Sequence, residues 1–253
     1  MAIEGISYHA AHFLIAAGAR PRPLEFHGHE HLVDSTDFME LPELPRRILF
    51  VGGGFISFEF AHIAARAGST PVILDRGPRP LKAFDPDLVE LLVSRGGEVG
   101  IELWRSTTIT AIEKSRRGFQ VSVERSGQSE TVGFDLVVHG AGRVPELAGL
   151  NLDAAAVEWD VRGVRVAPHL QSTSNAAVYA AGDAANTPGM PLTPVAVFEG
   201  KVAASNMLKA STTVPDYSGV PTAVFTIPEV ARVGMLEQEA RDQGIDKIGR
   251  AHV

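Results

Sequence analysis

Three consecutive glycines between an apolar strand and a helix constrain the fold of this chain most strongly. Ile48–Val51, just before them, form a continuous apolar run of the length of a strand buried on both faces. From Phe55 onwards, apolar side chains cover most faces of a predicted helix, and Gly68 is suited to end it. A second apolar strand ends at Asp75. This order predicts an α/β fold with a parallel sheet.

The three glycines have the spacing of a loop that holds a dinucleotide. Gly52 permits a tight turn, and Gly54 lets a pyrophosphate approach the backbone. The helix that follows offers free N–H groups and a partial positive charge. Ser57 stands at the third glycine position, which predicts slightly looser packing of the helix on the strand. The predicted binding residues are Gly52, Gly53, Gly54 and, in the first turn, Ile56; a plain glycine turn is the alternative.

Asp75 is placed to accept hydrogen bonds from ribose hydroxyls, because it ends the second strand 21 residues after Gly54. Its carboxylate would repel a 2′-phosphate, since two like charges ~4 Å apart cost several kcal/mol at intermediate dielectric. The sequence therefore favours NAD. Arg76, also predicted to bind the cofactor, is followed by Arg79 and Lys82, and these three cations leave NADP as the alternative.

The rest of the chain predicts further alternating elements. A short helix is expected within residues 35–45, and a helix opened by Asp85 and Pro86 is expected to stop at Gly96 or Gly97. Residues 109–124 predict a hairpin that turns at 116–118, and residues 134–142 predict a strand. Further strands are expected over residues 5–19 and near 178, with a helix beginning near Thr193.

Composition and charge limit the classes of partner that this chain could bind. The net charge is −7 without basic runs, which argues against nucleic acid and anionic membranes. No apolar run approaches the roughly 20 residues that span a bilayer, and no secretory signal is expected. The chain has no cysteine, so it holds neither disulfide nor thiolate. We expect a cytoplasmic protein without a metal site; the HGHEH run at 27–31 is interpreted as a solvated turn.

Five motifs resemble, in the same order, those of the pyridine nucleotide–disulfide oxidoreductases, the family of glutathione reductase, dihydrolipoyl dehydrogenase and mercuric reductase. They are IAAGARPRP at 15–23, the glycine loop, HGAGRVPE at 139–146, VYAAGD at 178–183 with LTP at 192–194, and VFTIPEVARVGMLEQEA at 224–240. Ala17 and Ala141 replace threonines that are usual in the family, and Glu146 replaces an asparagine. The resemblance runs from about residue 3 to 244.

The resemblance implies a Rossmann-like NAD(P)-binding domain inserted in a partial FAD-binding domain, as in flavoproteins with two dinucleotide-binding domains. Residues 1–41 and 142–215 would form the FAD-binding part, 42–141 the NAD(P)-binding domain, and 216–253 the start of a dimerisation domain. The last six residues, 248–253, read IGRAHV, which a common sequencing adapter can encode. We expect them to be an artefact, a hypothesis that the codons of the gene test.

The resemblance also implies the residues that hold FAD. Asp183 would bind the ribitol hydroxyls, Gly182 would let the cofactor come close, and a solvated Gly-Asp turn is the alternative. The helix that begins at Thr193 would direct its N–H groups at the pyrimidine edge of the flavin. The remaining implied residues are Gly18, Gly142, Arg143, Leu192 and Pro194.

Phe55 and Glu59 have implied roles where flavin meets nicotinamide. Phe55 corresponds to an aromatic residue that shields the flavin in relatives. Glu59 lies four residues later, hence on the same helical face, and corresponds to a glutamate that approaches the same region. A half-buried carboxylate with a local partner is the alternative for Glu59.

The implied parent enzyme is a homodimer that moves a hydride from NAD(P)H to flavin and electrons on to a disulfide or similar small-molecule acceptor. The family's redox cysteines, first flavin-binding segment and His-Glu pair are not found in this sequence. We therefore interpret the chain as a fragment without catalytic residues and expect it to be inactive alone. The alternatives are a cysteine-independent flavin enzyme, like NADH oxidase or ferredoxin reductase, and a non-catalytic nucleotide-binding module.

Overall fold

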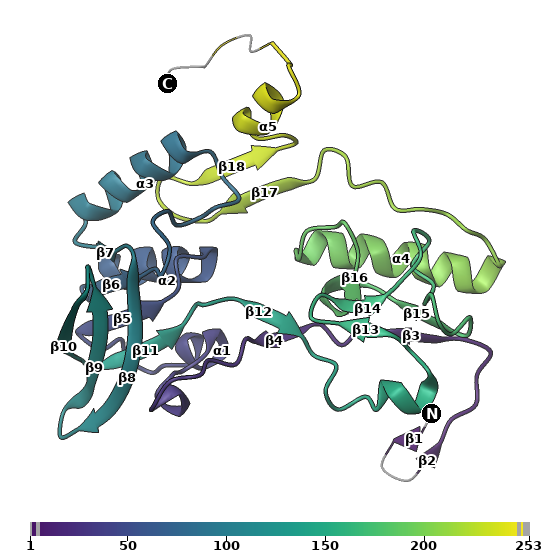
Figure 1. The fold of residues 1–253 in the computed structure, drawn as a ribbon, viewed down its shortest axis with the longest axis horizontal. Helices are drawn as coiled ribbons and strands as arrows, with labels where there is room; N and C mark the ends of the chain where they lie inside the picture. Colours follow the sequence, from purple (N-terminus) through teal and green to yellow (C-terminus); the bar gives the residue numbers. More distant parts are fainter. Residues whose placement is uncertain (1, 4–5, 247–248, 250–253) are drawn as a thin grey trace. The chain divides into compact units, whose positions relative to one another are not determined.

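The computed structural model describes residues 2–3, 6–246 and 249. The chain divides into two compact units, Met1–Arg20 with Arg143–Val220 and Pro21–Gly142 with Pro221–Val253 (Figure 1). Residues 21–41, expected from the sequence to belong to the FAD-binding part, pack in the second unit. The proposed artefact at 248–253 lies outside the described residues, apart from Gly249.

A four-stranded parallel sheet is the centre of the second unit, in the order β11-β5-β6-β7. The strands are β5 (Arg47–Val51), β6 (Thr70–Leu74), β7 (Glu102–Trp104) and β11 (Leu136–His139). Ile48, Leu49 and Phe50 are fully buried, which confirms that the apolar run is a strand covered on both faces. The α/β class is confirmed.

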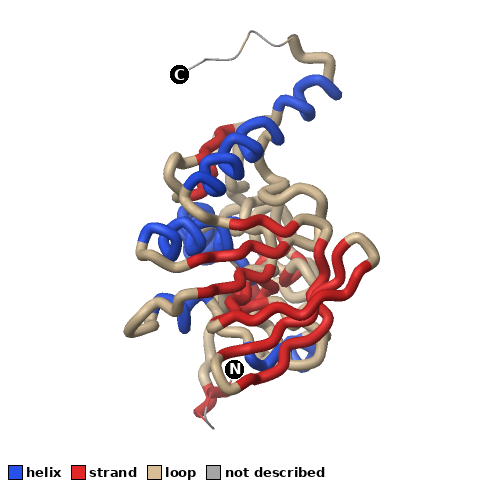
Figure 2. Tube along the Cα trace, turned by 90° about the vertical axis from the view of Figure 1, so that its left-hand side faces the viewer, coloured by secondary structure: helices blue, strands red, loops and turns tan. Residues whose placement is uncertain are grey.

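Helices cover one face of this sheet, and a second sheet covers the other. Ile48 and Phe50 pack towards α1 (Ser35–Met39), α2 (Phe55–Arg66) and α3 (Pro86–Glu98). Leu49 and Val51 point the opposite way, because side chains alternate along a strand. They pack on the antiparallel strands β8 (Thr107–Ser115), β9 (Gly118–Arg125) and β10 (Gln128–Phe134). Figure 2 shows these strands in red and the helices in blue.

Two details of the second unit differ from the sequence predictions. The predicted hairpin is confirmed, but β10 was not predicted, because its first four residues are polar and exposed. The stop of α3 at Gly96 or Gly97 was wrong: the helix continues to Glu98, and Gly100 has the positive φ of 86°. Gly96 is instead buried against His62 and Ile101.

The C-terminal segment completes the helical face of the second unit. Strands β17 (Pro221–Val224) and β18 (Val230–Val233) pair antiparallel and are followed by α5 (Glu237–Asp242). Val224 and Val230 are buried in the same cluster as Phe58 and Leu92. The predicted histidine-rich turn at 27–31 contains a short 3-10 helix, η1 (His29–His31).

The first unit consists of short strands and one long helix. β3 (Phe13–Ile15) pairs in parallel with β15 (Val178–Ala180), and β4 (Ala19–Pro21) pairs with β12 (Arg143–Pro145). The predicted strand over 5–19 is thus shorter, since β2 (Ile6–Ser7), paired with β1 (Ala2–Ile3), is separate and exposed residues intervene. The remaining elements are β13 (Trp159–Asp160), β14 (Gly163–Arg165), β16 (Ala185–Asn186), η2 (Leu152–Ala155), η3 (Gly182–Ala184) and α4 (Thr193–Lys209).

Helix α4 begins at Thr193, as predicted, and covers this unit with Val202 and Ala203, which pack on Tyr179 and Leu170. Neither α4 nor any other helix within the described residues is long and apolar enough to traverse a bilayer.

Close packing of α2 on β11 generates a first prediction. Ser57 is fully buried, and a Cβ added to Gly140 would lie 2.0 Å from its Oγ. We expect Gly140→Ala to cost about 1–3 kcal/mol of unfolding free energy, the range for overpacking. The cost should fall by at least about 1 kcal/mol in a Ser57→Ala background, measured by urea unfolding as a double-mutant cycle. Equal costs in the two backgrounds would show that the two positions do not interact.

His62 on α2 generates a second prediction. It is 3% exposed, and burial, aided by the Arg66 guanidinium, lowers its pKa to about 4. The folded chain therefore binds this proton less readily than the unfolded chain, so stability is full above about pH 6.5 and falls towards pH 4. The loss through this group should be on the order of 3 kcal/mol. Urea unfolding between pH 7 and 4.5 should show a weaker pH dependence for His62→Gln; an unchanged slope would refute the assignment to His62.

Candidate functional site

Gly52, directly after β5, has a backbone that only glycine adopts easily. Its φ is +110°, and an added Cβ would lie 2.4 Å from the carbonyl oxygen of Gly140. Its N–H donates to the carbonyl of Leu74, at the end of β6, at 2.7 Å. The chain thus turns between the ends of both neighbouring strands, which is why the first glycine is required.

Gly53 lies against the acidic residue that ends β6. An added Cβ would be 2.5 Å from Oδ2 of Asp75. Oδ1 of Asp75 accepts a hydrogen bond from the N–H of Gly77 at 3.2 Å. The structure therefore brings together the glycine loop and the carboxylate. Of the cations that follow, Arg76 is exposed, and Arg79 donates to the carbonyl of Lys82.

Gly54 differs from the two glycines before it, because packing leaves room for a side chain there. Its φ is −90°, and the nearest atom to an added Cβ is 3.5 Å away. It is the N-cap of α2, where no side chain caps the N–H groups and no acidic residue lies in the first turn. Ile56 is half-buried in that turn, and Phe55 is 47% exposed. Uncapped amides with a partial positive charge can bind an anion.

Glu59 has a hydrogen-bond partner in the distant C-terminal segment. Its Oε1 accepts a hydrogen bond from the N–H of Phe225 at 2.9 Å. Further along the same helix, Arg66 donates to the carbonyl of Ile227 at 3.0 Å, and Nδ1 of His62 faces the N–H of Ile227 at 3.4 Å. Side chains of α2 thus hold the segment after β17, and a cofactor role for Glu59 stays a prediction.

In the first unit, Gly182 and Asp183 follow β15 in η3. Gly182 has a φ of +65°, and an added Cβ would lie 2.9 Å from the Cβ of Ala196 on α4. Its N–H donates to Oε2 of Glu199, also on α4, at 2.7 Å. The turn that carries the half-buried Asp183 is therefore fixed against α4.

The head of α4 is uncapped like that of α2. Leu192 is the N-cap and offers no side-chain acceptor, and the first turn contains no acidic residue. Thr193 and Pro194 are exposed there. The first unit thus contains both a carboxylate at the end of a strand, Asp183, and a helix with an uncapped head, α4. Glu199 of that helix accepts from the turn in which Asp183 lies.

Gly18 lies just before β4, and Gly142 and Arg143 lie at the start of β12, the strand that pairs with β4. Gly18 has a φ of +70° and accepts a hydrogen bond from the N–H of Glu146 at 2.9 Å. The Arg143 guanidinium donates to the carbonyl of Ala19. Gly142 has a φ of +99° and accepts from the N–H of Arg22 at 3.0 Å. These contacts order the backbone at β4 and β12. Binding of a cofactor by these residues stays a prediction.

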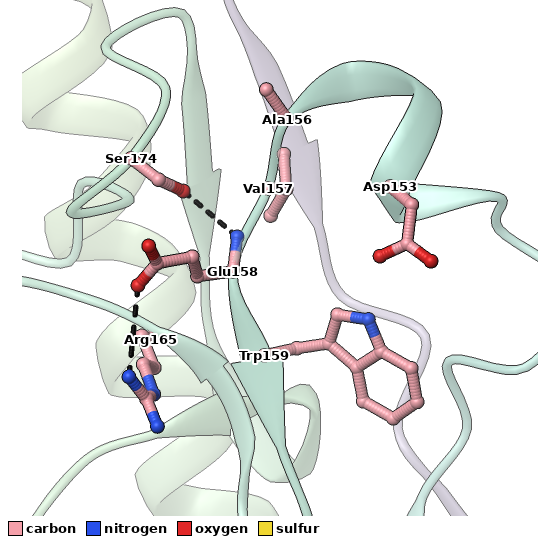
Figure 3. A pocket seen from close by; sticks show the side chains of 7 residues that line it. All are labelled: Asp153, Ala156, Val157, Glu158, Trp159, Arg165 and Ser174. Carbon is pink, nitrogen blue, oxygen red and sulfur yellow. Dashed lines mark hydrogen bonds and ion pairs between the residues drawn. The ribbon is translucent and has the colours of Figure 1, made fainter.

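A separate pocket of about 570 Å³ opens in the first unit (Figure 3). Two of its charged residues, Glu158 and Arg165, form an ion pair at 3.6 Å, and the Ser174 hydroxyl accepts from the N–H of Glu158 at 2.8 Å. The remaining lining residues are Asp153, Ala156, Val157 and Trp159. None of the predicted site residues lines this pocket. Within residues 2–3, 6–246 and 249, no three potential metal-ligating side chains gather.

Sequence reasoning missed two residues that shape these sites. Gly140 makes room for Ser57, and Glu199 anchors the turn before Asp183. The structure shows that Glu199 is buried. In the sequence, an acidic residue in this helix is indistinguishable from one whose side chain is solvated.

This chain is similar to known proteins. The family profile described as "Pyridine nucleotide-disulphide oxidoreductase" matches residues 3–200. Mercuric reductase of Staphylococcus aureus is 32% identical over 246 residues, covering 96% of this chain and 45% of the relative. Glutathione reductase of Burkholderia cepacia is 35% identical over 241 residues, covering 95% and 53%.

A solved structure agrees in fold. The Cu(II) complex of the HOCl-induced flavoprotein disulfide reductase RclA from Escherichia coli superposes with a TM-score of 0.83 at 26% identity. The match covers 93% of this chain and 53% of that chain. The chain thus spans about half the length of these relatives. The match of the family profile to residues 3–200 shows that this chain belongs to the pyridine nucleotide-disulphide oxidoreductase family.

Proposed function

We propose that this chain is the nucleotide- and flavin-binding part of an oxidoreductase that uses NAD(P)H and FAD to reduce a disulfide-type or other small-molecule acceptor. The observation that carries the proposal is the uncapped head of α2 at Gly54, beside the carboxylate of Asp75, which lies against Gly53 and accepts from the N–H of Gly77. Backbone N–H groups can donate hydrogen bonds to the pyrophosphate of a dinucleotide, and the carboxylate beside them can accept hydrogen bonds from the hydroxyls of its adenine-side ribose.

The residues of the second unit suit NAD. The amides after Gly54 would hold the pyrophosphate, since no side chain occupies them and packing leaves space at Gly54. Asp75 would accept hydrogen bonds from the ribose hydroxyls, and its charge would oppose a 2′-phosphate. Arg76 lies exposed beside it and would serve the same end of the cofactor.

The residues of the first unit suit FAD. When bound, FAD supplies a ring that accepts a hydride and passes on electrons. Asp183 would bind ribitol hydroxyls, and the uncapped amides at the head of α4 would stabilise negative charge on the pyrimidine edge. In the second unit, Phe55, exposed at the head of α2, would supply a stacking surface for a cofactor ring, and Glu59 would serve the nicotinamide side.

We further propose that residues 42–141 are the NAD(P)-binding domain, that 1–41 and 142–215 are FAD-binding, and that 216–253 begin a dimerisation domain. The parent enzyme would be a cytoplasmic homodimer without nucleic-acid or membrane partners. The chain alone should bind dinucleotide at about micromolar to millimolar concentration without disulfide reductase turnover, because it lacks cysteines.

Isothermal calorimetry of the chain with NADH tests the proposal. Saturable heat with a dissociation constant below about 1 mM is expected, corresponding to about −4 kcal/mol of binding free energy. No heat at millimolar NADH or NADPH would contradict it, and turnover by the purified chain would contradict the expected inactivity.

A substitution at Gly54 separates binding from folding. Gly54→Ser puts a preferred capping residue at a position with room for it, so we expect stability to stay equal or rise by about a few tenths of a kcal/mol. Affinity for NADH should fall at least about tenfold, because the serine oxygen and Cβ take the place of the phosphate. Gly97→Ser on α3, where an added Cβ meets nothing within 4 Å, is the matched control and should leave affinity unchanged. Undiminished affinity of Gly54→Ser would count against the site.

A substitution at Asp75 tests the choice between the two nucleotides. Asp75→Ala removes the acceptor for the ribose hydroxyls and the charge that repels a 2′-phosphate. We expect the ratio of NADPH to NADH affinity to rise at least about tenfold, a change of about 1.4 kcal/mol. Calorimetric titration with both nucleotides measures the ratio; a ratio equal to that of the unchanged chain would show that Asp75 does not discriminate.

A further inference from the structure

Glu199, on the second turn of α4, is a carboxylate with 1% of its surface exposed. Its Oε2 accepts from the N–H of Gly182 at 2.7 Å. Its Oε1 accepts from the hydroxyls of Thr187 and Tyr217, each at 2.7 Å. In the described part of the chain, no lysine or arginine forms an ion pair with it. Three neutral donors, two from the turn at 182–187 and one from Tyr217, therefore converge on one buried acid.

Burying a carboxylate is costly unless hydrogen bonds replace its water. The three short contacts provide them, and burial together with the nearby Glu199 raises the pKa of Tyr217, so its hydroxyl remains a donor. The loop after Thr187 closes over the same point: an added Cβ at Gly189 would lie 2.7 Å from the Tyr217 ring and 2.8 Å from Glu199. An apolar side chain at 199 would leave the Gly182 N–H unpaired, so packing alone does not explain an acid here.

We propose that Glu199 is a positioning residue, which holds the turn from Gly182 to Thr187 against α4 before any ligand arrives. Asp183 lies within that turn, and the uncapped head of α4 belongs to the same helix. The acid thereby fixes the two elements that the proposed function assigns to the flavin, and its importance for a flavin rests on that proposal.

Asn206, further along α4, offers a matched control. It is fully buried, and its Nδ2 donates to the carbonyls of His169 and Thr213, each at 2.9 Å. Its Oδ1 accepts from Ser211 and from the N–H of Thr213. It thus anchors several segments on the same helix without bonding to the turn at 182–187.

Amide hydrogen exchange by NMR on the full chain tests the proposal, with unfolding measured alongside. Glu199→Ala should speed exchange at Gly182 at least about tenfold beyond the effect of lower global stability. Glu199→Gln should restore exchange to within about threefold, because its oxygen can accept from Gly182 while its NH₂ donates to the two hydroxyls. Asn206→Ala should lower stability and leave Gly182 unchanged.

Equal exchange at Gly182 in Glu199→Ala and Asn206→Ala, or failure of Gln to restore it, would overturn the proposal. If Glu199→Ala does not fold, Thr187→Val decides: faster exchange at Gly182 supports the proposal, and unchanged exchange opposes it. A parallel titration with FAD, read by flavin fluorescence, addresses the proposed function. If FAD affinity falls in the variants whose Gly182 amide exchanges faster, the result supports both the positioning role of Glu199 and the proposed flavin site. If the exchange pattern is as predicted but no variant binds FAD, the flavin role is removed and the hold of Glu199 on the turn remains.

Discussion

The turn from β5 into α2 runs so close to the ends of β6 and β11 that its first two residues have no room for a side chain. At Gly52 the obstacle is the backbone of Gly140, and at Gly53 it is the carboxylate of Asp75. This proximity fixes the direction of α2 and sets the acid beside the helix head. Gly54 alone has space around it, so its lack of a side chain is explained by a ligand better than by packing.

The two proposed sites share one physical design, in which a helix with an uncapped head lies near a carboxylate at a strand end. In α1, by contrast, Asp34 caps the helix by accepting from the N–H groups of Thr36 and Asp37. At α2 and α4 the N-caps are Gly54 and Leu192, which offer no acceptor. The head of α3 also lacks a side-chain cap, because Oδ1 of its N-cap residue, Asp85, accepts from the N–H of Glu237. At α2 and α4 the N-cap residues have no acceptor at all, which is consistent with ligands that take the place of caps.

Local sequence predicted the elements of this design because their causes are local. A strand buried on both faces must be an apolar run, and a tight turn must be glycine, so β5, the loop and Asp75 could be found without a structure. The end of α3 could not, since Gly96 serves packing against Ile101 and not the helix stop. The roles of Gly140 and Glu199 depend on partners from distant segments, and no pattern around either residue specifies them. Strand β10 was missed because its exposed polar residues carry no alternation.

The most direct test of the central claim, that backbone amides at the head of α2 hold a diphosphate, is an NMR titration of the ¹⁵N-labelled chain with NADH. We expect the amide signals of residues 53–57 and 75–77 to shift together and saturate, while those of β8–β10 stay in place. Saturable shifts confined to other parts of the chain, or no shifts at millimolar NADH, would contradict it.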